Sequence, residues 1–159
     1  MEQDSSTVVT VERHVNAPAE AVWKVLSDGW VYPLWVVGAS RIRDVDTEWP
    51  AEGAVLHHSV GLWPGLVDDT TEVLSCDPPR EIKLRARAWP AGSAEVVITV
   101  EDLGAETSKV TITEDAVAGP GKLAPRLARQ AMIKPRNEET LLRLALLSEG
   151  RWRDPVSRD

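Results

Sequence analysis

The chain has 159 residues, of which 43% are hydrophobic and 27% are charged. This composition is typical of a soluble globular domain, and the length predicts one domain over residues 1–159, with an ordered core over about 7–150. The chain carries 25 acidic and 18 basic side chains, a net charge of −7. That charge argues against nucleic acid or an anionic lipid surface as a partner unless the basic residues cluster. The single cysteine, Cys76, excludes an intrachain disulfide and a multi-cysteine zinc site.

The N-terminus and the apolar stretches bear on location. Residues 1–6 contain neither a basic segment nor an apolar run, so we expect no secretory signal. The longest apolar stretch, over residues 30–39, is too short to cross a bilayer and contains Pro33. These features predict a cytoplasmic protein without a membrane span.

The first quarter of the chain predicts one strand and two short helices. Residues 7–15 alternate in polarity and are rich in valine, which indicates a strand. Pro18 suits the first turn of a helix, and residues 33–37 form a second, short helical piece.

The rest of the chain predicts a strand meander and one long helix. Alternating runs bounded by Pro and Gly turns predict six more strands, over residues 40–46, 54–62, 66–76, 81–88, 93–103 and 107–117. A helical segment over 122–147 follows, and it is the only predicted element long enough to cover one face of such a sheet. The predicted fold class is therefore α+β. A curved, seven-stranded antiparallel sheet wraps on a long C-terminal helix, and two short helices lie between its first and second strands.

Three motifs carry a resemblance to a known family. They are the run 11–23 with its Ala17-Pro18 turn, Glu72-Val73 followed by Asp77-Pro78-Pro79-Arg80, and Arg136-Asn137 followed by Leu141, Leu144 and Glu149. With them the chain resembles the START-related superfamily of polyketide cyclases, dehydrases and lipid carriers, over about residues 8–151. The resemblance implies a helix-grip fold with a cavity for a mostly apolar ligand between sheet and helix. It implies no metal and no organic cofactor. Because the superfamily contains enzymes, transporters and receptors, it leaves the function open.

Side-chain alternation along the strands indicates which residues face such a cavity. Tyr32 and Trp35 of the short helix are expected to close one end, and Leu127 of the long helix is expected to line the wall. The apolar phases of the strands contribute further ligand-binding candidates, which are Leu56, Val60, Leu84, Val96, Ile98 and Ile112.

Polar residues within these phases are the candidates for chemistry. His58 and Glu114 each interrupt an apolar phase. The strand over 66–76 has two mixed phases, and Thr70 and Glu72 point inward if its leucines do. Burial raises the pKa of a carboxyl group toward neutrality, so His58, Glu72 and Glu114 are candidate catalytic acids and bases. Each has a structural alternative: a histidine satisfied in the core, a glutamate on the outer face, and a glutamate reaching solvent at the rim.

Other motifs fail on spacing. Gly119-Pro120-Gly121-Lys122 lacks the first Gly and the Ser/Thr of a phosphate-binding loop. The adjacent His57 and His58, and the acidic residues over 68–72, lack the spacing of metal sites. The basic residues of the long helix lack interleaved aromatics and indicate a solvated face; they are Arg126, Arg129, Lys134, Arg136 and Arg143.

Two functions remain open, with a third less favoured. The chain is a cyclase or dehydrase for a small hydrophobic or aromatic molecule, or a non-catalytic carrier or sensor of a lipid or small molecule. The third is a partner-binding module that uses exposed tryptophans. Turns containing Trp63 and Trp89 lie at the same end of the predicted meander, so we expect ligand to enter past them. The oligomeric state is expected to be a monomer or a homodimer.

Overall fold

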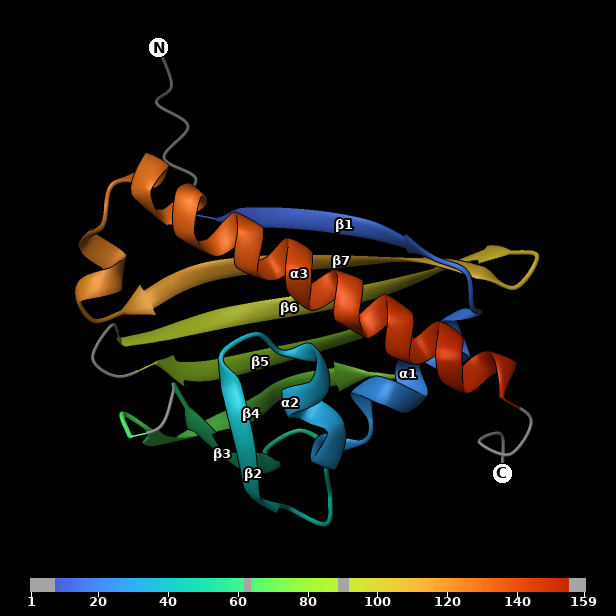
Figure 1. Cartoon of the computed structure of the whole chain (residues 1–159), viewed down its shortest axis with the longest axis horizontal. Helices are drawn as coiled ribbons and strands as arrows, with labels where there is room; N and C mark the ends of the chain where they lie inside the picture. Colours follow the sequence, from blue (N-terminus) through green and yellow to red (C-terminus); the bar gives the residue numbers. More distant parts are fainter. Residues whose placement is uncertain (1–7, 62–63, 89–91, 155–159) are drawn as a thin grey trace.

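The computed structural model of the protein describes residues 8–61, 64–88 and 92–154 (Figure 1). Seven strands form one antiparallel sheet in the order β1-β7-β6-β5-β4-β3-β2. The elements in chain order are β1 (Val9–Val15), α1 (Ala19–Leu26), η1 (Gly29–Val31), α2 (Tyr32–Trp35), β2 (Ala39–Val45), β3 (Val55–Val60), β4 (Val67–Asp77), β5 (Glu81–Ala88), β6 (Gly92–Gly104), β7 (Thr107–Ala118), η2 (Pro120–Leu123) and α3 (Arg126–Arg153). The predicted α+β fold with its long C-terminal helix is confirmed.

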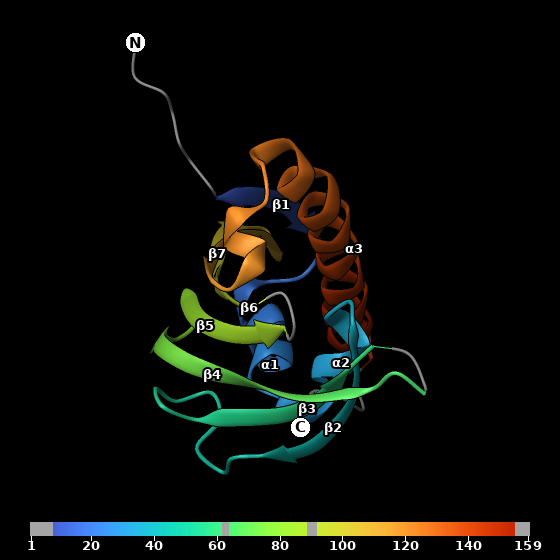
Figure 2. The ribbon, with the colours of Figure 1, turned by 90° about the vertical axis from the view of Figure 1, so that its left-hand side faces the viewer.

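The helix α3 crosses one face of the sheet, and the sheet curves around it (Figures 1 and 2). The sheet turns an apolar phase toward the helix because its strands alternate, with Val110 and Ile112 of β7 fully or almost fully buried. Leu141, Leu144 and Ala145 of α3 are buried against this face. The core therefore lies between the sheet and the C-terminal half of α3, where α1 also packs.

The C-terminal end of α3 is longer than the sequence predicts. The helix continues to Arg153 rather than ending near residue 147. Arg151 lies 3.4 Å from the carboxylate of Asp28, and Arg153 lies 3.7 Å from that of Glu149. These contacts join the last turns of α3 to one another and to the residue that precedes η1.

A β-bulge in β4 sets which of its side chains face inward. The register with β5 shifts between Val73 and Ser75. The orientation of Leu74 therefore does not indicate which face of the sheet the residues before it occupy. Thr71 and Val73 are buried on the concave face, and alternation then places Thr70 and Glu72 on the outer face. The prediction that Thr70 and Glu72 point inward is therefore wrong, and Glu72 lies across the ladder from exposed Arg85.

Among the described residues, no helix combines the length and the apolar character that crossing a bilayer requires.

Gly92 is a position where the fold requires glycine. Its φ is +111°, and a Cβ there would collide with the carbonyl oxygen of Ala118 at the end of β7. Gly53 also has a positive φ, of +85°, but a Cβ there would meet nothing within 4 Å.

We predict that G53A lowers the free energy of unfolding by about 1–2 kcal/mol, the strain of a positive φ alone. G92A should cost clearly more, as measured by urea denaturation. Equal losses in the two variants would show that the strand ends separate freely.

Candidate functional site

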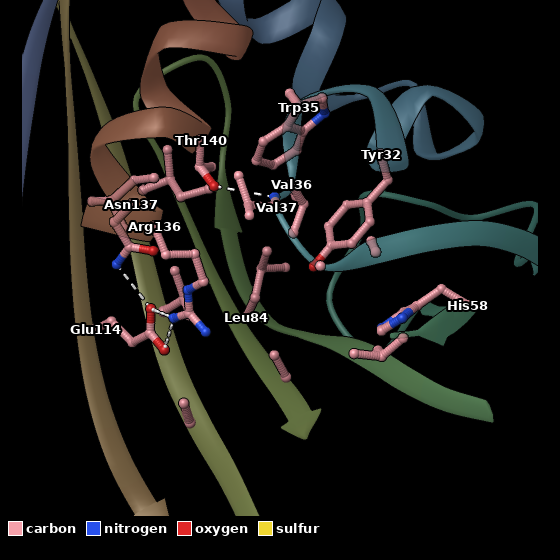
Figure 3. Close-up of a pocket in the computed structure, with 18 of the residues that line it drawn as sticks. Tyr32, Trp35, Val36, Val37, His58, Leu84, Glu114, Arg136, Asn137 and Thr140 are labelled. Carbon is pink, nitrogen blue, oxygen red and sulfur yellow. Dashed lines mark hydrogen bonds and ion pairs between the residues drawn. The ribbon is translucent and has the colours of Figure 1, made fainter. Parts of the chain in front are cut away.

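A pocket of about 240 Å³ lies between the concave face of the sheet, α2 and the middle of α3 (Figure 3). It exists because small side chains leave room: Ala86 of β5 and Ala94 of β6 lie opposite each other in the ladder and both line the space. Most of the remaining wall is apolar, contributed by Val36, Val60, Leu84, Val96, Ile98 and Ile112. A cavity of about 150 Å³ with an apolar lining is large enough for benzene, so this pocket has room for a ligand of one or two rings.

One polar group in the wall is a chain of three buried side chains. Nε2 of His58 lies 2.9 Å from Oγ1 of Thr71, and the hydroxyl of Tyr32 lies 3.3 Å from the same oxygen. His58 and Tyr32 line the pocket, while Thr71 connects them from behind. Arg43 donates to the carbonyl oxygens of His58 and Asp69, and so fixes the backbone that carries the histidine. The helix α2 and the neighbouring strands β3 and β4 thus converge on one hydroxyl.

Burial determines the protonation of these groups. It lowers the pKa of His58, against an opposing effect of the nearby Asp69 carboxylate, so the imidazole is neutral near pH 7. A neutral imidazole has one nitrogen that donates and one that accepts. Nδ1 makes no hydrogen bond of ordinary geometry among the described residues, although the nearby backbone of Ser59 acts to raise the pKa of the ring. Burial raises the pKa of Tyr32, so its hydroxyl keeps its proton. The group therefore holds transferable protons without a net charge.

The other polar group joins the sheet to the helix. Nη2 of Arg136 lies 2.5 Å from both carboxylate oxygens of Glu114, and Nδ2 of Asn137 donates to one of them at 2.8 Å. The Glu114 side chain is only 8% exposed, so it does not reach solvent at the rim. Since both its oxygens are engaged, the geometry suits Glu114 to holding Arg136 in the pocket wall (Figure 3).

The segment after α2 closes the pocket against α3. Oγ1 of Thr140 accepts a hydrogen bond from the amide of Val37 at 3.2 Å. The rings of Tyr32 and Trp35 meet edge to face with centroids 5.2 Å apart. Nε1 of Trp35 is buried and has no partner among the described residues.

The structure brings most of the predicted site residues to this pocket. Nine of them line it: Tyr32, Trp35, His58, Val60, Leu84, Val96, Ile98, Ile112 and Glu114. Trp63 and Trp89 lie outside the described residues, so an entrance past them stays a prediction. Residues next to those turns, Val60, Arg87 and Ala94, belong to the lining.

Four predicted residues lie elsewhere. Leu56 is fully buried in the core and is not part of the lining. Thr70 and Glu72 face outward because of the β4 register, which places Glu72 on the opposite face of the sheet from His58. Leu127 is 81% exposed and is not part of the lining.

The polar residues of α3 were missed as site residues. Arg136, Asn137 and Thr140 all line the pocket. Asn137 and Thr140 are spaced four residues before Leu141 and Leu144, so they continue the apolar stripe at helical period, and that signal is present in the sequence. The expectation of a solvated basic face is also wrong in part, because Arg129 is buried and Arg136 enters the pocket wall.

The described residues contain no group of three or more His, Cys, Asp or Glu side chains that could hold a metal ion.

Comparison with known proteins agrees with this architecture. A family model described as polyketide cyclase/dehydrase and lipid transport matches residues 6–149. The Zhui aromatase/cyclase from Streptomyces sp. R1128 is a similar solved structure, with 25% identity and a TM-score of 0.70 over 92% of this chain and 95% of that one.

Two further solved structures share the fold alone. One is a conserved protein from Geobacillus kaustophilus, with 16% identity and a TM-score of 0.72 over 90% of this chain and 95% of that one. The other is a START superfamily protein from Mycobacterium smegmatis, with 21% identity and a TM-score of 0.63 over 91% and 96%. Among curated proteins, the comparison finds no match.

The lowered pKa of His58 predicts a pH dependence of stability. Below the ordinary value of 6.5 the unfolded chain takes up a proton that folded His58 does not, so the unfolded state is favoured as the pH falls. We expect the wild type to lose stability between about pH 7 and about pH 5, and H58Q to lose less. Denaturation at several pH values measures this, and a nitrogen-15 NMR titration of the ring reports the pKa directly. A pKa at or above 6.5 would contradict the prediction.

Proposed function

The chain belongs to the polyketide cyclase/dehydrase and lipid-transport family, and on that premise we propose that it binds a small hydrophobic or aromatic molecule and dehydrates it during ring formation. The observation that carries the catalytic part is the buried chain of Tyr32, Thr71 and His58 at the edge of an otherwise apolar pocket. The likeness to a protein named an aromatase/cyclase supports the same chemistry.

The proposed step is the loss of water from a β-hydroxy ketone. Nδ1 of His58 is buried, so the ligand must displace the wall beside the ring to reach it. Nδ1 then takes a proton from the carbon beside the ligand carbonyl, and that C–H electron pair becomes the new C=C bond. The C–O bond of the β-hydroxyl breaks, and the hydroxyl leaves as water with a proton from Tyr32. Thr71 returns a proton to Tyr32, and Nε2 of His58 returns one to Thr71. His58 thereby changes tautomer, and no net charge develops in the apolar pocket.

Arg136 has a separate part in the proposal. A guanidinium has five N–H donors, and the contacts to Glu114 use only Nη2. The other donors can hydrogen-bond the ligand carbonyl, where negative charge grows as the carbon loses its proton. Glu114 and Asn137 keep the guanidinium in place, which makes them positioning residues.

A non-catalytic carrier is the second candidate. The observation that favours it is that both carboxylate oxygens of Glu114 are already hydrogen-bonded. Of the three predicted acid-base residues, only His58 is then placed to act on a ligand. In a carrier, the same polar groups would only orient the ligand.

Binding is tested first, with naphthol as the probe and titration calorimetry as the measurement. We predict that the wild type binds naphthol and that A86F, which fills the space between β5 and α3, weakens binding by more than about tenfold. A51F, a matched change at an exposed turn, should leave it unaltered. Absence of naphthol binding by the wild type would remove both candidate functions.

Turnover is tested with the β-hydroxy ketone formed from benzaldehyde and acetone, whose dehydration produces a strongly absorbing enone. We predict that H58Q slows the reaction by about a hundredfold or more while naphthol binding changes little. T71V, which lacks the hydroxyl, should also slow dehydration. T71S, which keeps the hydroxyl, should retain most of the wild-type rate. If the wild type binds naphthol but does not accelerate dehydration, the result would contradict the catalytic proposal and support the non-catalytic carrier.

A further inference from the structure

One end of the molecule differs sharply in charge from the rest of the chain. The 22 residues over 116–137 contain five basic and no acidic side chains. The remainder of the chain holds the other 13 basic side chains and all 25 acidic ones. This stretch covers the end of β7, η2 and the first turns of α3, which project together at one end of the structure (Figures 1 and 2).

The same stretch exposes large apolar side chains. Leu123, Leu127 and Met132 are 86%, 81% and 75% exposed, the three highest values among the exposed large hydrophobic residues described. Lys122 and Lys134 are exposed beside them in sequence. We call these five residues the basic apolar end. Exposed apolar side chains beside basic ones are typical of surfaces that bind membranes.

We propose that the basic apolar end docks on an anionic lipid bilayer. Leu123 and Leu127 would enter the boundary between headgroups and acyl chains, and the lysines would pair with lipid phosphates. Charge complementarity favours this surface, because residues 116–137 hold five basic and no acidic side chains while the rest of the protein is acidic. Acidic neighbours weaken the attraction in part: Glu138 lies 4.0 Å from Lys134, and Asp68 and Asp69 line a hollow together with Gly119 and Pro120.

The exposure of the leucines favours lipid over a protein partner. A protein interface buries its anchors in pockets of matching shape, whereas a bilayer accepts protruding side chains without a shaped partner. The basic apolar end is also close along α3 to the pocket, since Arg136 and Asn137 of the next turn line it. Docking would therefore bring the pocket near a phase in which apolar molecules dissolve. This inference does not depend on the dehydration chemistry and holds equally for a carrier.

Vesicle co-sedimentation with the full chain tests the proposal. We expect the wild type to bind vesicles of equal parts phosphatidylcholine and phosphatidylglycerol, to bind phosphatidylcholine alone far more weakly, and to dissociate as salt is raised. The double variant L123S/L127S should lose about tenfold in affinity or more. K122Q/K134Q should lose about fivefold for each charge removed.

Matched controls separate a local surface from a general effect. L146S removes an exposed leucine nearer the other end of α3, and K24Q removes an exposed lysine of α1; neither should alter vesicle binding. Thermal melting should show all variants folded, because each changed side chain is exposed. The proposal is overturned if the anionic vesicles do not bind the wild type, or if the controls weaken binding as much as the double variants do. It is also overturned if light scattering shows that the leucines serve instead to pair two copies of the chain.

Discussion

The ion pair between Glu114 of β7 and Arg136 of α3 lies where the apolar packing between sheet and helix ends. On one side of it, Leu141 and Leu144 of α3 are buried in a solid core with α1. On the other side, small side chains leave the pocket open. The Glu114 carboxylate is buried while Arg136 keeps part of its surface in solvent. A buried carboxylate needs accurate geometry and further hydrogen bonds, and Asn137 provides one of them. The pair thereby fixes the distance between helix and sheet where no hydrophobic contact would.

Much of the fold follows from local pattern. The polarity of the strands alternates at period two and the turns contain Pro and Gly, so the meander and the long helix are evident from the chain alone. The phase of β4 is not, because a bulge depends on which residues of two strands pair, and Leu74 suggests the wrong face for Glu72. The partners of Glu114 are equally hidden, since they come from a helix 22 residues later in the chain. Nothing in the sequence marks Thr71 as a site residue, because an inward-facing threonine is ordinary in a strand.

The two polar groups of the pocket differ in chemical character. Tyr32, Thr71 and His58 are neutral and linked through hydroxyl hydrogen bonds, so they can exchange protons. Glu114 and Arg136 are bound to each other, so they provide a fixed field rather than a proton. An apolar wall separates the two, with Leu84 between them (Figure 3). The family shares the architecture, whereas the chemistry depends on which side chains occupy these two positions in this chain.

The pairing of β1 with β7 has a consequence for how the chain folds. Val9 lies opposite Glu114, so the first strand meets its neighbour in the sheet only after more than a hundred intervening residues. Closing so long a loop is entropically unfavourable and slows folding relative to a sheet built from consecutive hairpins alone. During synthesis, the strands β2 to β6 can pair one after another with their neighbours, while β1 has no strand beside it. The N-terminal strand therefore has no partner strand until β7 emerges from the ribosome, and until then its valines remain available to chaperones.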